Sequence, residues 1–166
     1  MIGTSVLETA DSIVVDTCVL ADFLFVNRDR HADALEACRL LPSVGKKALV
    51  PAHGFFELVS AAFSERHRRN ARLELGRFAK SLPFELEVVD ITVDFIESHL
   101  RAGLAAAGDD LDSSGGDMIY LTLALMQKIP LLTEDKRLLA KASKLGIAAY
   151  TSRSFVNAYI EQQSGA

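Results

Sequence analysis

The chain has 166 residues and a mass of 18.1 kDa, which is typical of a single domain. Hydrophobic residues make up 49% of it and charged residues 24%, values that exclude a disordered chain, a collagen-like chain and a coiled-coil rod. The net charge of −4 hides basic residues gathered in 64–80 and 128–153 and acidic residues gathered in 85–117. These sectors either steer a charged ligand or are ordinary solvated helix faces.

The sequence predicts a cytoplasmic protein with no membrane segment. No stretch approaches the roughly 18 uncharged apolar residues that a membrane helix needs. The first residues lack the basic start and apolar block of a secretory signal. Cys18 and Cys38 form neither a zinc-binding pattern nor a disulfide framework, which favours a reducing compartment.

Short apolar runs alternate with longer helical segments along the chain. Buried strands are expected at 12–16, 47–51, 86–91, 130–133 and 146–150. Helices are expected near 18–27, 30–41, 53–68, 70–81, 93–107, 116–128, 135–144 and 153–162. Because parallel strands need long crossovers, this order predicts one α/β domain over 12–162, with a mostly parallel sheet and helices on both faces. Residues 1–11 are an N-terminal extension.

Parallel sheets of this kind bind ligands beyond the carboxyl ends of their strands. Asp16 directly follows one expected strand, and Glu134 and Asp135 follow another. Neither strand is followed by a glycine-rich phosphate loop, so dinucleotide and P-loop sites have no support.

Each of four acids has an ordinary structural explanation when it is taken alone. Asp16 suits a turn between strand and helix, and Asp117 and Asp135 suit helix caps. Glu57 lies on a helical stripe of small or polar residues that faces either a cleft or water. Together, however, strand ends and helix starts converge at one edge of such a sheet. Clustered carboxylates repel, and Mg²⁺ or Mn²⁺ would remove that repulsion.

Four segments of the chain resemble the motifs of one known family. They are Ile13–Leu20, Val50–Glu57, Gly116-Asp117 and Leu131–Asp135. In order and spacing they resemble the motifs of PIN-domain ribonucleases, most closely the toxin half of VapBC-type toxin–antitoxin pairs. The resemblance covers residues 12–150 and implies a five-stranded parallel PIN-like fold.

The resemblance implies a Mg²⁺- or Mn²⁺-dependent endoribonuclease that cleaves RNA phosphodiesters with metal-activated water. Asp16, Glu57, Asp117 and Asp135 would be its catalytic and metal-binding acids. Thr17 and Thr133 would orient carboxylates, with Asp112 and Ser114 as further supporting candidates. The family further implies a homodimer and a cognate antitoxin protein. Basic residues expected to contact RNA phosphates are Arg66, Arg68, Arg69, Arg72, Lys136 and Arg137.

Two positions depart from the family pattern, and two other functions stay open. Cys18 stands where the family usually has Asn, and Met118 stands where it usually has Ala. Neither change removes a carboxylate, but both bear on substrate choice. One alternative is a catalytically silent PIN-like binding or scaffold module. The other is a phosphatase with Asp16 as its nucleophile, although the second Asp of that pattern is replaced by Cys18.

Overall fold

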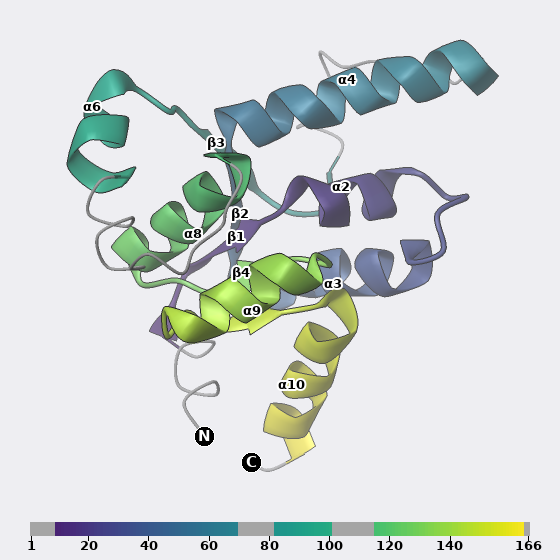
Figure 1. Cartoon of the computed structure of the whole chain (residues 1–166). Coiled ribbons are helices and arrows are strands. Elements are labelled where there is room, and N and C mark those ends of the chain that lie inside the picture. Colours follow the sequence, from purple (N-terminus) through teal and green to yellow (C-terminus); the bar gives the residue numbers. More distant parts are fainter. Residues whose placement is uncertain (1–8, 70–81, 101–114, 165–166) are drawn as a thin grey trace.

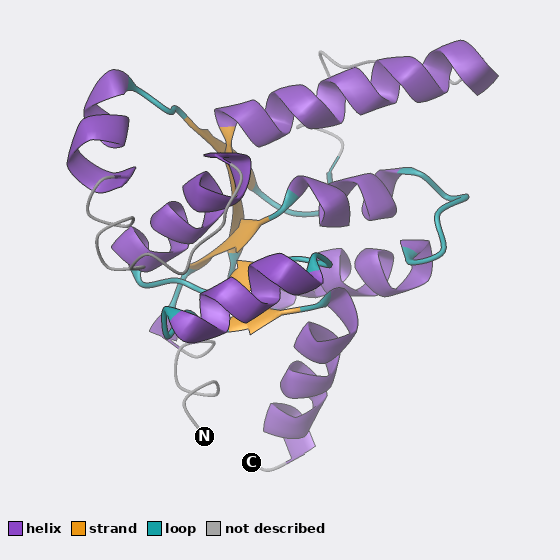
Figure 2. Ribbon diagram, in the orientation of Figure 1, coloured by secondary structure: helices purple, strands orange, loops and turns teal. Residues whose placement is uncertain are grey.

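A computed structural model describes residues 9–69, 82–100 and 115–164, and a five-stranded sheet runs through its centre (Figures 1 and 2). The strand order is β3-β2-β1-β4-β5, and every pairing is parallel. The strands are β1 Ser12–Val15, β2 Lys47–Pro51, β3 Leu86–Val89, β4 Leu131–Leu132 and β5 Ala149–Tyr150. The predicted α/β fold with a parallel sheet is confirmed.

Helices connect the strands and cover both faces of the sheet (Figure 2). They are α2 Thr17–Leu24, α3 His31–Ser43, α4 Ala52–Arg69, α6 Val93–Phe95, the π-helix η2 Ile96–Leu100, α8 Gly115–Gln127, α9 Lys136–Lys144 and α10 Ser152–Ser164. The helix expected at 70–81 lies outside the described residues, as does the second half of the one expected at 93–107.

The central strand β1 divides the interior into two hydrophobic cores. Ile13 and Val15 point to one core, which they share with buried residues of α2, α3, α4 and α10. Val14 points to the other, which includes residues of α8 and α9. Alternate strand residues face opposite sides of a sheet, so an unbroken apolar run such as this one requires cover on both faces.

The expected strands differ from the observed ones in length and, for β3, in burial. The 86–91 run was predicted to be buried, but β3 forms an edge of the sheet and pairs with β2 alone. Glu87 and Val88 are therefore exposed, and Glu87 forms an ion pair with Lys47 on β2. β4 and β5 keep only two residues each, and β5 lacks the first three residues of the run expected at 146–150. Among the described residues, no helix combines the length and apolar character needed to cross a membrane.

Candidate active site

Asp16 lies at the carboxyl end of β1, where it caps α2. Its Oδ1 atom accepts the backbone N–H of Cys18 at 3.3 Å, which satisfies one of the free donors at the start of that helix. The hydroxyl of Thr133, just beyond β4, donates to Asp16 Oδ2 at 2.5 Å. Asp16 is only 9% exposed, so these donors stabilise its charge where little water reaches.

Cys18 adds a second contact to the same carboxylate. Its thiol donates to Asp16 Oδ2 at 3.0 Å, and its sulfur accepts the backbone N–H of Glu134 at 3.3 Å. Burial raises the pKa of the Cys18 thiol, and the charge of Asp16 raises it further. The thiol therefore stays protonated, so that it acts as a donor to Asp16 and not as a nucleophile.

Asp135 lies at the same edge of the sheet as Asp16, because β4 is the parallel neighbour of β1. Its backbone N–H donates to the Thr133 hydroxyl at 3.0 Å, so one hydroxyl connects the two acidic positions. The Asp135 side chain caps α9 by accepting from the backbone of Arg137 at 2.6 Å and of Leu138 at 3.2 Å. Asp135 thus has the helix-capping role expected for it, and this cap lies at the edge of the sheet where Asp16 is also found.

Asp117, in the first turn of α8, forms an ion pair with a lysine of α9. The two atoms are Asp117 Oδ2 and Lys141 Nζ, 3.1 Å apart. The Lys141 side chain is 14% exposed and that of Asp117 is 28% exposed, so water screens this pair less than it screens a surface pair. The pair links Asp117 to the helix that Asp135 caps.

Tyr120, one turn after Asp117, brings α8 against the starts of α2 and α4. Its hydroxyl lies 2.5 Å from the Thr17 hydroxyl, which donates to the Gly54 carbonyl at 3.0 Å. Burial raises the pKa of Tyr120, and the charges of Asp16 and Glu57 add to that rise. These two acids therefore lie within electrostatic reach of one phenol. Thr17 itself bonds Tyr120 and Gly54, whereas Thr133 bonds a carboxylate.

Glu57 and His53 come from the first turns of α4, the helix that follows β2. Glu57 is exposed, so its side chain is available to solvent at this edge. The His53 ring packs edge-on against Tyr120, with centroids 5.2 Å apart. Both its ring nitrogens are buried and have no hydrogen-bond partner among the described residues. Buried polar atoms normally have a hydrogen-bond partner, so the His53 ring places an unsatisfied donor or acceptor at this edge.

The other predicted residues are placed only in part. Lys136 and Arg137 are exposed in the first turn of α9, directly after Asp135. Arg66, Arg68 and Arg69 fall on the end of α4, and their side chains lie outside the described part. Asp112, Ser114 and Arg72 are outside the described residues altogether.

A sequence profile of the PIN domain matches residues 13–145, which is most of the chain and the range within which the four acids lie. The chain belongs to the PIN domain family. PIN domains are generally nucleases, hydrolases that act on nucleic acid, and they generally use divalent metal ions. A search of curated protein sequences returned no match.

Two solved structures share this fold at low sequence identity. One is a PilT N-terminus domain protein from the hyperthermophilic archaeon Sulfolobus solfataricus, with 13% identity, a TM-score of 0.51, and coverage of 90% of this chain and 94% of its own. The other is VapBC2 from Rickettsia felis bound to a DNA fragment from its promoter, with 14% identity, a TM-score of 0.53, and coverage of 84% and 98%. These likenesses independently support the PIN fold.

The donor chemistry of this PIN domain fits a hard divalent cation. The candidate ligands are the carboxylates of Asp16, Glu57, Asp117 and Asp135, and Mg²⁺ and Mn²⁺ prefer such oxygen ligands. The ring nitrogens of His53, which lack a hydrogen-bond partner among the described residues, lie next to Tyr120 at the same edge. Across the described residues, however, no three His, Cys, Asp or Glu side chains meet in a group that could hold a metal ion. In this arrangement Asp117 contacts an ammonium group, and Asp135 contacts backbone N–H groups.

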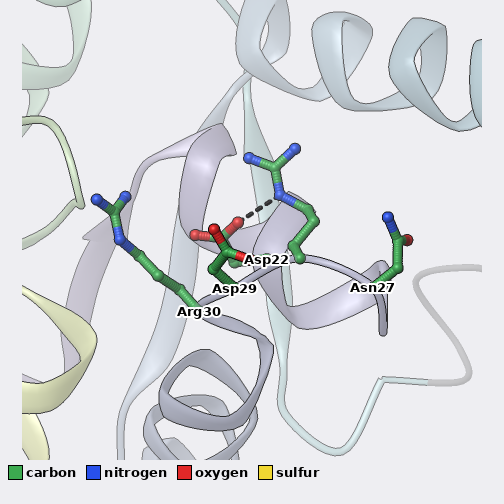
Figure 3. A pocket seen from close by; sticks show the side chains of 5 residues that line it. Asp22, Asn27, Asp29 and Arg30 are labelled. Carbon is green, nitrogen blue, oxygen red and sulfur yellow. Dashed lines mark hydrogen bonds and ion pairs between the residues drawn. The ribbon is translucent and has the colours of Figure 1, made fainter.

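A separate pocket of about 380 Å³ lies beside the α2–α3 loop of the PIN domain (Figure 3). Its lining residues are Asp22, Asn27, Arg28, Asp29 and Arg30. Figure 3 shows Asp22 and Asp29 between Arg30 and Asn27. Two acids oppose two bases, so the lining is balanced in formal charge and is not a strong anion site. Within this lining, Arg28 forms an ion pair with the buried carboxylate of Asp22.

Sequence reasoning missed several residues that shape the site. Tyr120 carries a signal, since it lies three positions after Asp117 and so on a neighbouring part of the same helix face. Gly54 and Lys141 carry none, because their partners come from other segments of the chain. Cys18 was noticed as a departure from the family, but its bonds to Asp16 and Glu134 depend on the β1–β4 pairing.

Proposed function

We propose that this PIN domain is a metal-dependent endoribonuclease with Asp16, Glu57, Asp117 and Asp135 as its acidic residues. The observation that carries the proposal is the shared Thr133 hydroxyl, which contacts Asp16 and the backbone of Asp135 from adjacent strands. A carboxylate held in place by hydrogen bonds at a strand end is a suitable cation ligand. Glu57 is included because α4 begins directly after β2, and Asp117 because Tyr120 of the same helix, α8, contacts Thr17 at the start of α2.

The proposed metal is Mg²⁺ or Mn²⁺, held by these four acids. When bound, such an ion supplies positive charge against the phosphodiester and lowers the pKa of water. Other side chains of the protein position the acidic residues. Thr133 and Cys18 fix the orientation of Asp16, and Tyr120 holds α8 against α2 and α4 so that Asp117 stays near the edge.

RNA is the proposed substrate, and its phosphates would contact Lys136 and Arg137. Both side chains are exposed, and they follow Asp135 directly in the sequence. Arg66, Arg68, Arg69 and Arg72 are proposed as a second group of phosphate contacts. Because phosphate contacts release counterions, binding should weaken steeply as salt concentration rises.

We further propose that the protein is a toxin inhibited by a cognate antitoxin and that it works as a homodimer. The support is the PIN family match together with the likeness to VapBC2, which is described as bound to promoter DNA. That likeness is one of fold, so the partner needs its own test. Co-purification with the product of an adjacent open reading frame, followed by light scattering, would measure both partner and copy number.

The decisive experiment is cleavage of a mixed RNA pool in Mn²⁺ by the wild type and by Asp16→Asn and Asp135→Asn. Both variants should lose cleavage, because each loses a charged oxygen ligand while keeping the shape of the side chain. Glu85→Gln is the control, since Glu85 is exposed and directly precedes β3, at the amino ends of the strands and so at the opposite edge of the sheet. Full activity in either site variant contradicts the assignment. A wild type that binds RNA but never cleaves it supports the scaffold alternative instead.

A further inference from the structure

Lys141 places a positive charge inside the acidic edge of the sheet. Its Nζ atom lies 3.1 Å from Asp117 Oδ2, and both side chains are largely shielded from water. Asp16 and Asp135 differ, because the donors they accept are hydroxyl, thiol and backbone N–H groups without charge. An ammonium group therefore stands where the proposed function requires a metal ion to approach.

The position of Lys141 is fixed by the packing of α9 against the core. Leu138 and Ala142 flank it in the helix, and both are buried in the core that also contains Met118 of α8. Asp135 fixes the start of the same helix by capping it. The base of the Lys141 side chain thus cannot move away from α8, but its flexible stem allows the ammonium group to swing outward.

We propose that Lys141 is a positioning residue that serves as the internal counter-ion of Asp117 and that a divalent cation must displace to bind there. This inference rests on the proposed function. The lysine keeps the edge from carrying uncompensated negative charge when no metal is bound. It also sets the metal affinity, because an ammonium group and a divalent cation close to one carboxylate repel.

Removing the charge of Lys141 should increase the affinity for Mn²⁺, whereas removing a purely structural lysine would not. Lys141→Met removes the competing charge, so Mn²⁺ should bind at least about tenfold more tightly than to the wild type. Lys141→Arg keeps the charge and should remain near the wild-type affinity. In metal-free buffer Lys141→Met should unfold at a lower temperature, because Asp117 loses its ammonium partner, and Mn²⁺ should raise that temperature more than in the wild type.

The test is isothermal titration of Mn²⁺ into the wild type, Lys141→Met, Lys141→Gln, Lys141→Arg and Asp117→Asn, with thermal unfolding in EDTA as a check of folding. Lys141→Gln retains a polar tip and replaces Lys141→Met if the latter does not fold. Lys47→Met is the matched control, because it breaks another lysine–carboxylate pair at the start of β2, away from the carboxyl ends of the strands.

Tighter binding in Lys141→Met or Lys141→Gln, with Lys141→Arg and Lys47→Met unchanged, supports the inference. Equal or weaker binding in the neutral variants overturns it but leaves the proposed function standing, provided that Asp117→Asn loses the ion bound by the wild type. If neither the wild type nor any neutral variant binds Mn²⁺, both the inference and the proposed metal site are overturned.

Discussion

The hydroxyl of Thr133 donates a 2.5 Å hydrogen bond to Asp16 Oδ2 between residues 117 positions apart in the sequence. The contact exists because β1 and β4 are parallel neighbours that end at the same edge. Thr133 is fully buried, and its oxygen also accepts the backbone N–H of Asp135. The Thr133 hydroxyl thus donates to the carboxylate of Asp16 and accepts from the backbone of Asp135, so it ties the end of β1 to the start of α9.

Replacing Thr133 by valine should destabilise the protein by about 2 kcal/mol, because a buried carboxylate and a backbone N–H both lose a partner. The side chain keeps its shape, so the loss reports hydrogen bonding and not packing. Urea unfolding measures the change. Thr133→Ser is the control, since it retains the hydroxyl and should recover most of the stability. Equal losses in both variants would show that the methyl group matters and the hydroxyl does not.

Gly54 should tolerate no side chain, because the Tyr120 hydroxyl occupies the place where a Cβ atom would lie. Gly54→Ala should therefore displace Tyr120 and break its contact with Thr17, at a cost of about 1–3 kcal/mol. Combining Gly54→Ala with Tyr120→Phe removes the clashing oxygen, so the two changes together should cost less than their sum.

Gly115→Ala is the matched control for this cycle. Gly115 also begins a helix that borders the site, but nothing lies within 4 Å of the place its Cβ would take. The substitution should leave the stability near that of the wild type. If Gly54→Ala behaves in the same way, the close approach of Tyr120 to α4 is not a constraint on the fold.

The sequence was sufficient to predict the fold and the location of Asp16 and Asp135 after two strands of the sheet, because both depend on local patterns. Apolar runs followed by acids mark strand ends, and in a parallel sheet those ends share an edge. Which atoms meet there depends on packing between distant segments. The link from Lys141 to Asp117 and the contact of Gly54 with Tyr120 depend on how α8 packs against α9 and α4, and no local pattern encodes that. The burial of β3 was predicted wrongly because its sequence does not reveal its place at the edge of the sheet.

Stability should fall at alkaline pH because the buried thiol of Cys38 is kept neutral. Burial raises its pKa from the ordinary value of 9.0 to about 12. In the unfolded chain the thiol ionises above about pH 9, while in the folded chain it stays protonated up to about pH 12. The unfolded state then binds fewer protons, so stability decreases with rising pH across this window, by up to about 1.4 kcal/mol per pH unit for one group.

Urea unfolding under reducing conditions at pH 7, 8, 9 and 10 tests this prediction, with Cys38→Ala as the comparison. The variant will have a lower stability throughout, because it loses buried volume. Above pH 9, however, its curve should fall less steeply than that of the wild type. Parallel curves would mean that the Cys38 thiol contributes nothing to the alkaline loss.

Two arginine–aspartate pairs of this chain should differ sharply in their contribution to stability. Arg28 pairs with Asp22, whose side chain is 4% exposed, whereas Arg153 pairs with Asp33, which is 34% exposed. Arg28→Met should cost about 2 kcal/mol or more, because a buried carboxylate is left without its cation. Arg153→Met should change stability by less than about 1 kcal/mol, since water screens that pair.

The cause is tested by removing both partners of the buried pair. Asp22→Leu combined with Arg28→Met leaves no unpaired charge and should recover part of the stability that Arg28→Met loses. Urea unfolding of Arg28→Met, of the double variant and of Arg153→Met, at low and at high salt, measures each difference. If Arg28→Met and Arg153→Met cost the same at both salt concentrations, burial of Asp22 does not make its pairing important. If Arg28→Met destabilises the protein more than Arg153→Met at either salt concentration, the buried carboxylate of Asp22 requires its ion pair with Arg28, and that pair holds the α2–α3 loop in place.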